Sequence, residues 1–261
     1  MKNFISNSVL LCLVITSNFL YSQKQDDLKI LDNKFSEANI FYNNSDYQNA
    51  IELYNAIIDS GYHSSELYYN LGNSYYKIND IANSILYFEK SIKLNPSDKD
   101  VINNLNIVNN STIDDIEKLP ESFFDIQINK ISNILGYSDW GIILIIFSFL
   151  FLILFITYFF SNKSSIKRFT FSSLIILIIF MGLTLKISFH AYKKNHLEKH
   201  AIIFASKVDI KSDPNETSEN LLILHVGTKV KIIETINDEW VKIKLVNGQE
   251  GFIKKNEIKI I

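Results

Sequence analysis

The sequence predicts a multidomain membrane protein that combines an all-α repeat solenoid, a two-helix transmembrane hairpin and a small all-β barrel. Three observations lead to this fold class. Small and aromatic residues recur with a period of 34 residues near the N-terminus, residues 141–160 and 169–185 contain no charged side chain, and short β-branched runs separated by turn residues fill positions 201–261. Because a helix needs about 20 apolar residues to cross a bilayer, the two uncharged stretches match membrane spans.

Residues 1–22 have the form of a signal peptide. Lys2 precedes an apolar stretch from Val9 to Ile15, and the small residue Ser22 stands where cleavage is expected. The single cysteine, Cys12, lies inside this leader, so we expect a mature chain without any thiol. Disulfide bonds and cysteine nucleophiles are then excluded. An uncleaved N-terminal anchor is the alternative interpretation.

Residues 23–110 are predicted to form a helical repeat domain. A shift of 34 residues aligns Ala38 with Gly72, Phe41 with Tyr75, Ala50 with Ser84 and Tyr54 with Phe88. In each repeat the small residue lets two helices approach closely, and the aromatic residue one turn further on fills the space beside it. The pattern resembles the tetratricopeptide repeat, with repeats at about 31–64 and 65–98 followed by a capping helix. A generic pair of helical hairpins is the alternative.

The resemblance implies a concave face that binds protein partners. This face would be lined by first-helix residues that point away from the packing positions. The candidate partner-binding residues are Phe35, Asn39, Tyr42, Asn43, Tyr69, Asn73, Tyr76 and Lys77. Aromatic and amide side chains combine rigid apolar area with hydrogen bonds and therefore suit an amphipathic peptide. Packing at the edge of the core is the alternative role for the tyrosines.

Residues 111–139 combine a polar linker with an amphipathic helix. Phe124, Ile128, Ile131 and Leu135 recur at helical spacing with polar residues between them. An amphipathic helix directly before a membrane span is expected to lie in the membrane interface. A last helix packed on the repeats is the alternative.

Two transmembrane helices are predicted over residues 140–160 and 169–189. The loop between them, 161–168, carries three basic residues, and short basic loops remain in the cytoplasm. An exported N-terminus followed by two spans places both soluble modules on the periplasmic side of a bacterial inner membrane. We therefore expect a multi-pass protein in contact with membrane lipid.

Residues 190–200 form a predicted juxtamembrane linker, and residues 201–261 a small barrel. Five strands are predicted, at 201–205, 208–211, 229–234, 241–245 and 251–253. Asn247-Gly248 between the last two strands is a strong hairpin signal.

The barrel region resembles bacterial SH3-like domains. The residues that carry the resemblance are Gly227-Thr228 before a strand, Trp240-Val241 at the start of the next, Gly248, Gly251 and Phe252. Phe252 stands where that family usually has Trp. Trp240 and Phe252 are the candidate ligand face, and packing in the barrel core is the alternative role for both.

No combination of residues in the sequence predicts catalysis, a cofactor or a metal site. His196 and His200 are one helical turn apart, but Leu197 follows the first of them where a zinc protease has Glu. His225 is expected at the barrel surface. We therefore predict that the protein is not an enzyme. Residues 23–118 carry 8 Lys against 15 Asp or Glu, and this negative balance disfavours nucleic acid as a partner.

The order of the modules resembles one family as a whole, the E component of the Bacteroides aerotolerance (Bat) proteins. Two stretches carry the likeness, IEKLPESFFDIQINKISNILGYSDWGIIL from residue 116 and AIIFASKVDIKSDPNETSENLLILHVGTKVKI from residue 201. The resemblance implies a non-catalytic scaffold or adaptor for other Bat components, which include von Willebrand A-type membrane proteins and an AAA+ ATPase, with a role in aerotolerance or envelope stress. The alternative is a cell-wall sensor whose SH3-like domain binds peptidoglycan peptides.

Overall fold

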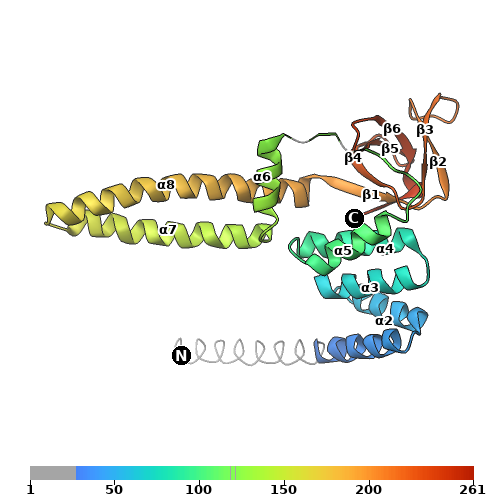
Figure 1. The fold of residues 1–261 in the computed structure, drawn as a ribbon, viewed down its shortest axis with the longest axis horizontal. Coiled ribbons are helices and arrows are strands. Elements are labelled where there is room, and N and C mark those ends of the chain that lie inside the picture. Colours follow the sequence, from blue (N-terminus) through green and yellow to red (C-terminus); the bar gives the residue numbers. More distant parts are fainter. Residues whose placement is uncertain (1–27, 118, 121) are drawn as a thin grey trace, which may run out of the picture.

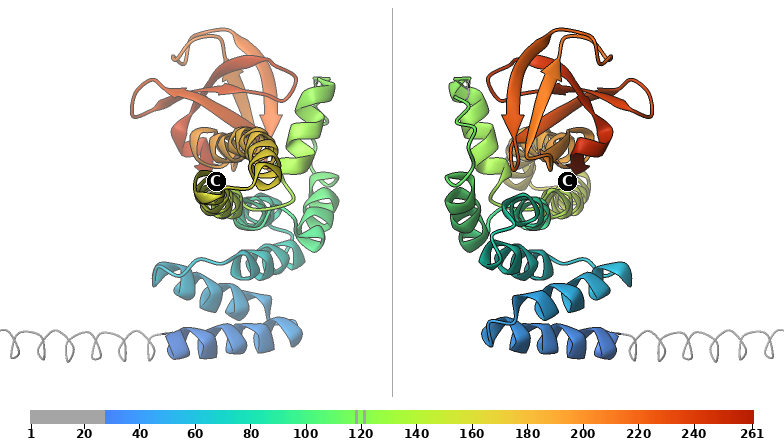
Figure 2. Two further views of the ribbon diagram at one scale, coloured as in Figure 1. Left: turned by 90° about the vertical axis from the view of Figure 1, so that its left-hand side faces the viewer. Right: turned by 90° about the vertical axis from the view of Figure 1, so that its right-hand side faces the viewer.

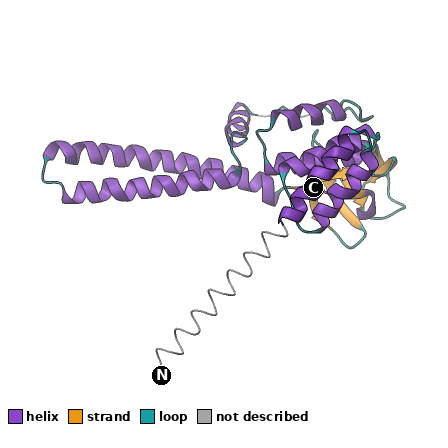
Figure 3. Ribbon diagram, turned by 90° about the horizontal axis from the view of Figure 1, so that it is seen from below, coloured by secondary structure: helices purple, strands orange, loops and turns teal. Residues whose placement is uncertain are grey.

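The computed structural model describes residues 28–117, 119–120 and 122–261, so the predicted signal peptide at 1–22 lies outside the described residues. The chain forms a stack of repeat helices, then a long helical hairpin, and finally a β barrel (Figure 1). The hairpin extends away from the other two parts, which lie together at its base (Figure 3).

In the described part of the chain, five helices build the repeat domain: the helix over residues 28–43, α2 (Tyr47–Asp59), α3 (Ser65–Lys77), α4 (Ile81–Leu94) and α5 (Lys99–Asn109). The period of 34 residues recurs in the turns between paired helices. Ser45 and Asn79 both have positive φ, of 64° and 62°. The next residue is in each case an aspartate, Asp46 or Asp80, whose side chain accepts a backbone N–H and caps the following helix.

Packing inside the repeats follows the 34-residue alignment. The aligned residues Ala38, Ala50, Tyr54 and Phe88 are all 0% exposed. Gly72 lies against the ring of Phe88, and a Cβ atom at Gly72 would be only 2.8 Å from Phe88 Cδ1. Ser84 Oγ donates a hydrogen bond to Gly72 O at 2.9 Å, which ties α4 to α3 at this point of close approach.

α7 (Tyr137–Phe160) and α8 (Ser164–Tyr192) form an antiparallel hairpin. Both helices are long and apolar enough to cross a membrane, by length and composition. The connecting loop spans only 161–163, so the predicted loop at 161–168 is too long. Lys167 and Arg168 lie in the first turns of α8, because basic residues are good helix formers and the helix continues beyond its apolar part.

α6 (Phe123–Ser132) is shorter than the predicted amphipathic helix, and Leu135 lies beyond its end. The helix packs against α8, where His190 Nε2 and Asn129 Oδ1 are 2.9 Å apart. The alternative interpretation, a last helix packed on the repeats, did not include this contact. Phe123 and Phe124 on α6 are 69% and 76% exposed. The helix therefore leaves an apolar surface uncovered beside the base of the hairpin.

A π-helical turn, η1 (Lys193–Leu197), leads from α8 into the barrel. Seven strands form one antiparallel sheet in the order β3-β2-β6-β5-β4-β1-β7. Their bounds are β1 (Lys199–Ile203), β2 (Lys207–Lys211), β3 (Asn220–His225), β4 (Lys229–Thr235), β5 (Trp240–Lys244), β6 (Glu250–Lys254) and β7 (Ile258–Ile260). The prediction of five strands missed β3, an unbroken apolar run without the usual alternation, and β7, which has three residues.

The barrel packs directly on the repeats, at the end of the stack opposite the helix over residues 28–43 (Figure 2). Ile202 of β1 is 0% exposed and belongs to the buried cluster of the repeats, with Ile85, Phe88 and Val101. An ion pair joins Lys229 of β4 to Glu89 of α4, with 2.6 Å between Nζ and Oε2. The two predicted modules are therefore one packed unit.

Candidate functional site

The concave side of the repeats contains a cavity of about 270 Å³. Five of the eight predicted partner-binding residues line it: Tyr42, Tyr69, Asn73, Tyr76 and Lys77. The remaining lining residues are Phe88 from α4 and Asn104, Ile107 and Val108 from α5. The α5 residues were not predicted to line it, because this helix was expected only to cap the repeats.

Asn104 organises the polar side of this cavity. Its Nδ2 donates to Asn73 Oδ1 at 2.8 Å and to Tyr69 OH at 3.2 Å. These bonds join α5 to α3 across the cavity and hold both acceptors in place. Tyr76 is 38% exposed and lies closer to solvent.

The other three predicted partner-binding residues do not line the cavity. The ring of Phe35 packs against Tyr54, with 5.8 Å between the centroids. Asn39 Oδ1 accepts hydrogen bonds from Tyr54 OH at 2.5 Å and from Asn70 Nδ2 at 3.1 Å. Phe35 and Asn39 therefore stabilise the first repeat, while Asn43 is exposed beside the turn.

The lining of the cavity limits what it can bind. Lys77 is the single charged residue among those that line it, and the others are aromatic, aliphatic or amide. Burial raises the pKa of Tyr42, whose hydroxyl therefore remains protonated and can donate a hydrogen bond. Such a lining suits a peptide segment that presents an apolar side chain next to an acidic group.

A second cavity, of about 420 Å³, lies on the barrel. Trp240 lines it and is only 5% exposed, so it does not form an open aromatic platform. Phe252 is half-buried on the adjacent strand and does not line this cavity. Because Trp240 pairs with Lys254 and Lys242 pairs with Phe252 in the β5–β6 register, both aromatic residues lie on the same face of the sheet.

Charged groups of both signs surround the barrel cavity. Lys207, Asp209, Lys211, Glu216, Lys254 and Glu257 line it together with Val208 and Trp240. Lys254 forms an ion pair with Glu216. Lys211 Nζ donates to Glu216 O at 2.9 Å, which fastens the loop between β2 and β3 over the sheet. Burial raises the pKa of the Glu257 carboxyl.

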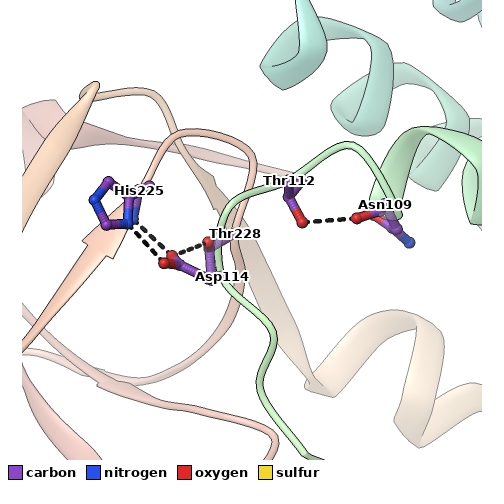
Figure 4. A network of polar contacts seen from close by, with 5 residues as sticks. All are labelled: Asn109, Thr112, Asp114, His225 and Thr228. Atoms are coloured by element: carbon purple, nitrogen blue, oxygen red, sulfur yellow. Dashed lines mark hydrogen bonds and ion pairs between the residues drawn. The ribbon is translucent and has the colours of Figure 1, made fainter.

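The predicted linker after the repeats is fixed to the barrel by Asp114 (Figure 4). Asp114 Oδ2 accepts hydrogen bonds from His225 N at 2.6 Å and from Thr228 Oγ1 at 2.5 Å, and Asp114 Oδ1 lies 2.7 Å from His225 Nδ1. Burial raises the pKa of this carboxyl, but the hydrogen bonds from Thr228 and His225 outweigh burial and lower the pKa below its usual value. His225 was expected at the surface; instead it belongs to this contact between modules.

No group of three or more His, Cys, Asp or Glu side chains that could hold a metal ion occurs in the described part of the chain. The side chain of His196, which the sequence places one helical turn before His200, lies outside the described residues. His200 lies where β1 meets the repeats, and burial lowers the pKa of its imidazole.

Comparison with known proteins identifies both soluble modules. Residues 65–98 match the tetratricopeptide repeat model, and residues 206–259 match the model of the bacterial SH3 domain. The chain is 30% identical over 57 residues to the cell wall-binding protein YwsB of Bacillus subtilis (strain 168). That match covers 22% of this chain and 32% of the relative, so the chain spans about a third of the relative's length. The chain thus contains a tetratricopeptide repeat and a bacterial SH3 domain.

Proposed function

We propose that the protein is a non-catalytic scaffold in a bacterial inner membrane, which presents its repeats and its SH3 domain on the periplasmic side. The observation that carries the proposal is the cavity on the concave side of the repeats, which tyrosines and amides from three helices line. A tetratricopeptide repeat favours a protein as the ligand of this cavity. The order of modules favours a place in a Bat-type complex that acts in aerotolerance or envelope stress.

The membrane placement is favoured by the surface of the hairpin. Phe149, Ile153 and Phe180 are 53–64% exposed, and large apolar residues cover both helices along their length. Exposed apolar surface of this extent is unfavourable in water and favourable in lipid. Both ends of the hairpin return to the same side, where the soluble unit lies, and the exposed phenylalanines of α6 would enter the membrane interface.

Reporter fusions test this placement. Fusions after residues 110 and 261 should both behave as exported, and a fusion at residue 162, in the loop at the far end of the hairpin, should behave as cytoplasmic. A cytoplasmic signal from the fusion after residue 261 would overturn the proposed topology.

Crosslinking and co-purification from native membranes test the protein-binding face. The double variant Tyr42→Ala/Tyr76→Ala should lose the co-purified membrane partner. Each aromatic anchor contributes about 2 kcal/mol, and two would lower the affinity by roughly three orders of magnitude. The matched control is Tyr62→Ala, because Tyr62 is 41% exposed and does not line the cavity. Unchanged partner recovery from a folded double variant would refute the proposed binding face.

A cell-wall ligand for the SH3 domain is the second candidate function. It is favoured by the similarity to a protein named for binding the cell wall and by the cavity beside Trp240, whose charges of both signs suit a zwitterionic peptide. In co-sedimentation with purified sacculi, Asp209→Asn/Glu257→Gln should reduce the bound fraction, since both carboxylates line the cavity. The control Glu234→Gln/Glu250→Gln removes two exposed carboxylates of the barrel that do not line the cavity. Equal sedimentation of both variants would argue against this function.

A further inference from the structure

A third cavity, of about 310 Å³, opens where the repeats, the base of the hairpin and the barrel meet. Its polar lining carries both signs of charge and comes from α4, the end of α6, η1 and the residue after it, β1 and β4. These residues are Glu89, Lys93, Ser132, Asn133, Lys194, Asn195, Glu198, His200 and Lys229. Its apolar lining comes from Ile92, Pro96, Ile102, Ala191 and Ile261. Residues far apart in the sequence therefore build one site with a charged side and an apolar side.

The cavity lies at the level expected for lipid headgroups. The predicted second span ends at residue 189, and Lys194 follows five residues later, about 7 Å further along the helix axis. The headgroup layer on each side of a bilayer is roughly 5–8 Å thick. Trp140 and Tyr192 at the neighbouring ends of α7 and α8 are residue types enriched at this boundary, and Phe189 is 63% exposed beside them.

The carboxylates that line the cavity already have cationic partners. Glu89 Oε2 is 2.6 Å from Lys229 Nζ, and Glu198 Oε1 is 2.8 Å from Lys231 Nζ. The pKa of the His200 imidazole is lowered, mainly by burial and to a smaller extent by the charge of Lys229. A ligand in the cavity therefore meets carboxylates that are already neutralised.

Lys93 and Lys194 supply the positive charge. Lys93 Nζ donates to Ile261 O at 3.3 Å, and Lys194 Nζ donates to Asn133 Oδ1 at 3.2 Å. Both lysine side chains are exposed at the mouth of the cavity that they line. Two ammonium groups with amide donors beside them are a suitable set for the oxygens of a phosphate group.

We infer that this cavity binds the phosphate of an anionic membrane phospholipid, with the glycerol and upper acyl carbons against the apolar side. This inference rests on the proposed membrane placement of the hairpin. It adds a lipid contact that fixes the soluble unit at the membrane surface, because the cavity walls belong to the repeats, α6, η1 and the barrel together.

Native mass spectrometry of the full chain in detergent tests the inference. Phosphatidylglycerol, phosphatidylcholine and inorganic phosphate are each titrated against the protein. The wild type should retain phosphatidylglycerol in preference to phosphatidylcholine. Lys93→Gln/Lys194→Gln should lower the affinity for phosphatidylglycerol by about thirtyfold. Each lysine contributes about 1 kcal/mol to binding an anionic lipid, and about 1.4 kcal/mol corresponds to a tenfold change in affinity.

The matched control is Lys99→Gln/Lys193→Gln. Lys99 of α5 and Lys193 of η1 are both exposed, and neither lines the cavity. Its affinity should equal that of the wild type. Equal losses in both double variants, no preference of the wild type for phosphatidylglycerol, or equal binding of inorganic phosphate would each overturn the inference. If the reporter fusions place the hairpin in the membrane while the lipid preference is absent, only this inference fails and the proposed function stands.

Discussion

The contact between Gly72 and Phe88 allows a quantitative test of the repeat packing. A Cβ atom at Gly72 would lie 2.8 Å from Phe88 Cδ1, 2.9 Å from Cε1 and 3.1 Å from Cγ. The ring has little freedom to move away, because Phe88 is 0% exposed and packs against Tyr69 with 6.0 Å between the ring centroids. Any side chain at Gly72 therefore has to push α3 and α4 apart.

Two opposing effects decide the size of the change. Replacing a helical glycine by alanine gains about 1 kcal/mol of helix propensity, whereas overpacking a core contact costs typically 1–3 kcal/mol. We expect Gly72→Ala to destabilise the repeats by about 0–2 kcal/mol. Gly72→Leu has a similar propensity but three more carbon atoms to accommodate than Gly72→Ala, so its cost should be at the upper end of this range, about 2 kcal/mol. That corresponds to roughly 4–8 °C in Tm, at about 2–4 °C per kcal/mol for a packed unit of roughly 150–250 residues.

The assay is thermal unfolding of the full chain in detergent, monitored by circular dichroism. The full chain is required because Ile202 of the barrel is buried in the repeat core. A second variant, Phe88→Leu, removes the ring that Gly72→Ala would strike, so the double variant should be more stable than the sum of the single effects predicts. A Tm of Gly72→Leu equal to that of the wild type would refute the close approach of α3 and α4.

Further predictions concern the junction between repeats and barrel. Asp114→Asn should lower the free energy of unfolding by about 1–3 kcal/mol, because the amide cannot replace all the hydrogen bonds that the carboxylate accepts. The pKa of Asp114 is lower in the folded than in the unfolded protein. Its stabilising contribution is therefore complete above the unfolded pKa of about 3.9 and is lost as the pH falls through the folded pKa. In denaturant titrations, the difference in the free energy of unfolding between wild type and Asp114→Asn should shrink below about pH 4. Ile202→Ala should destabilise by about 2–5 kcal/mol and accelerate hydrogen exchange in α4 and α5, although the residue belongs to β1. Ile260→Ala, at a position that is 51% exposed, should leave that exchange unchanged, and equal behaviour of the two variants would contradict the described junction.

Local sequence patterns were sufficient for the repeats and the hairpin. The small residue at Gly72 and the aromatic residue at Phe88 repeat an earlier pair, and period is a property that a single sequence displays. The uncharged stretches likewise lie in continuous sequence. Five of the eight predicted partner-binding residues line the cavity because helix periodicity fixes which first-helix residues share a face.

The features that the sequence analysis missed depend on contacts between distant residues. Asp114 and His225 are 111 residues apart, and nothing near either one indicates the other. Asn104 looked like one of several asparagines in a capping helix, yet it bonds to Asn73 and Tyr69 across the cavity. Trp240 stands at the start of a strand, where alternation alone cannot decide whether charged neighbours will cover it.

The shared core of the two modules has a consequence for how the protein could work as a scaffold. Val108 lines the concave cavity and also belongs to the buried cluster that contains Ile202 of the barrel. The same buried cluster thus reaches from the lining of the concave cavity to the SH3 domain, and Asp114 closes the junction from the linker side. Packed cores of this kind resist gradual deformation. A ligand on the repeats and a ligand on the barrel would therefore be held at a fixed separation above the hairpin, which is a property that two modules on a flexible tether could not provide.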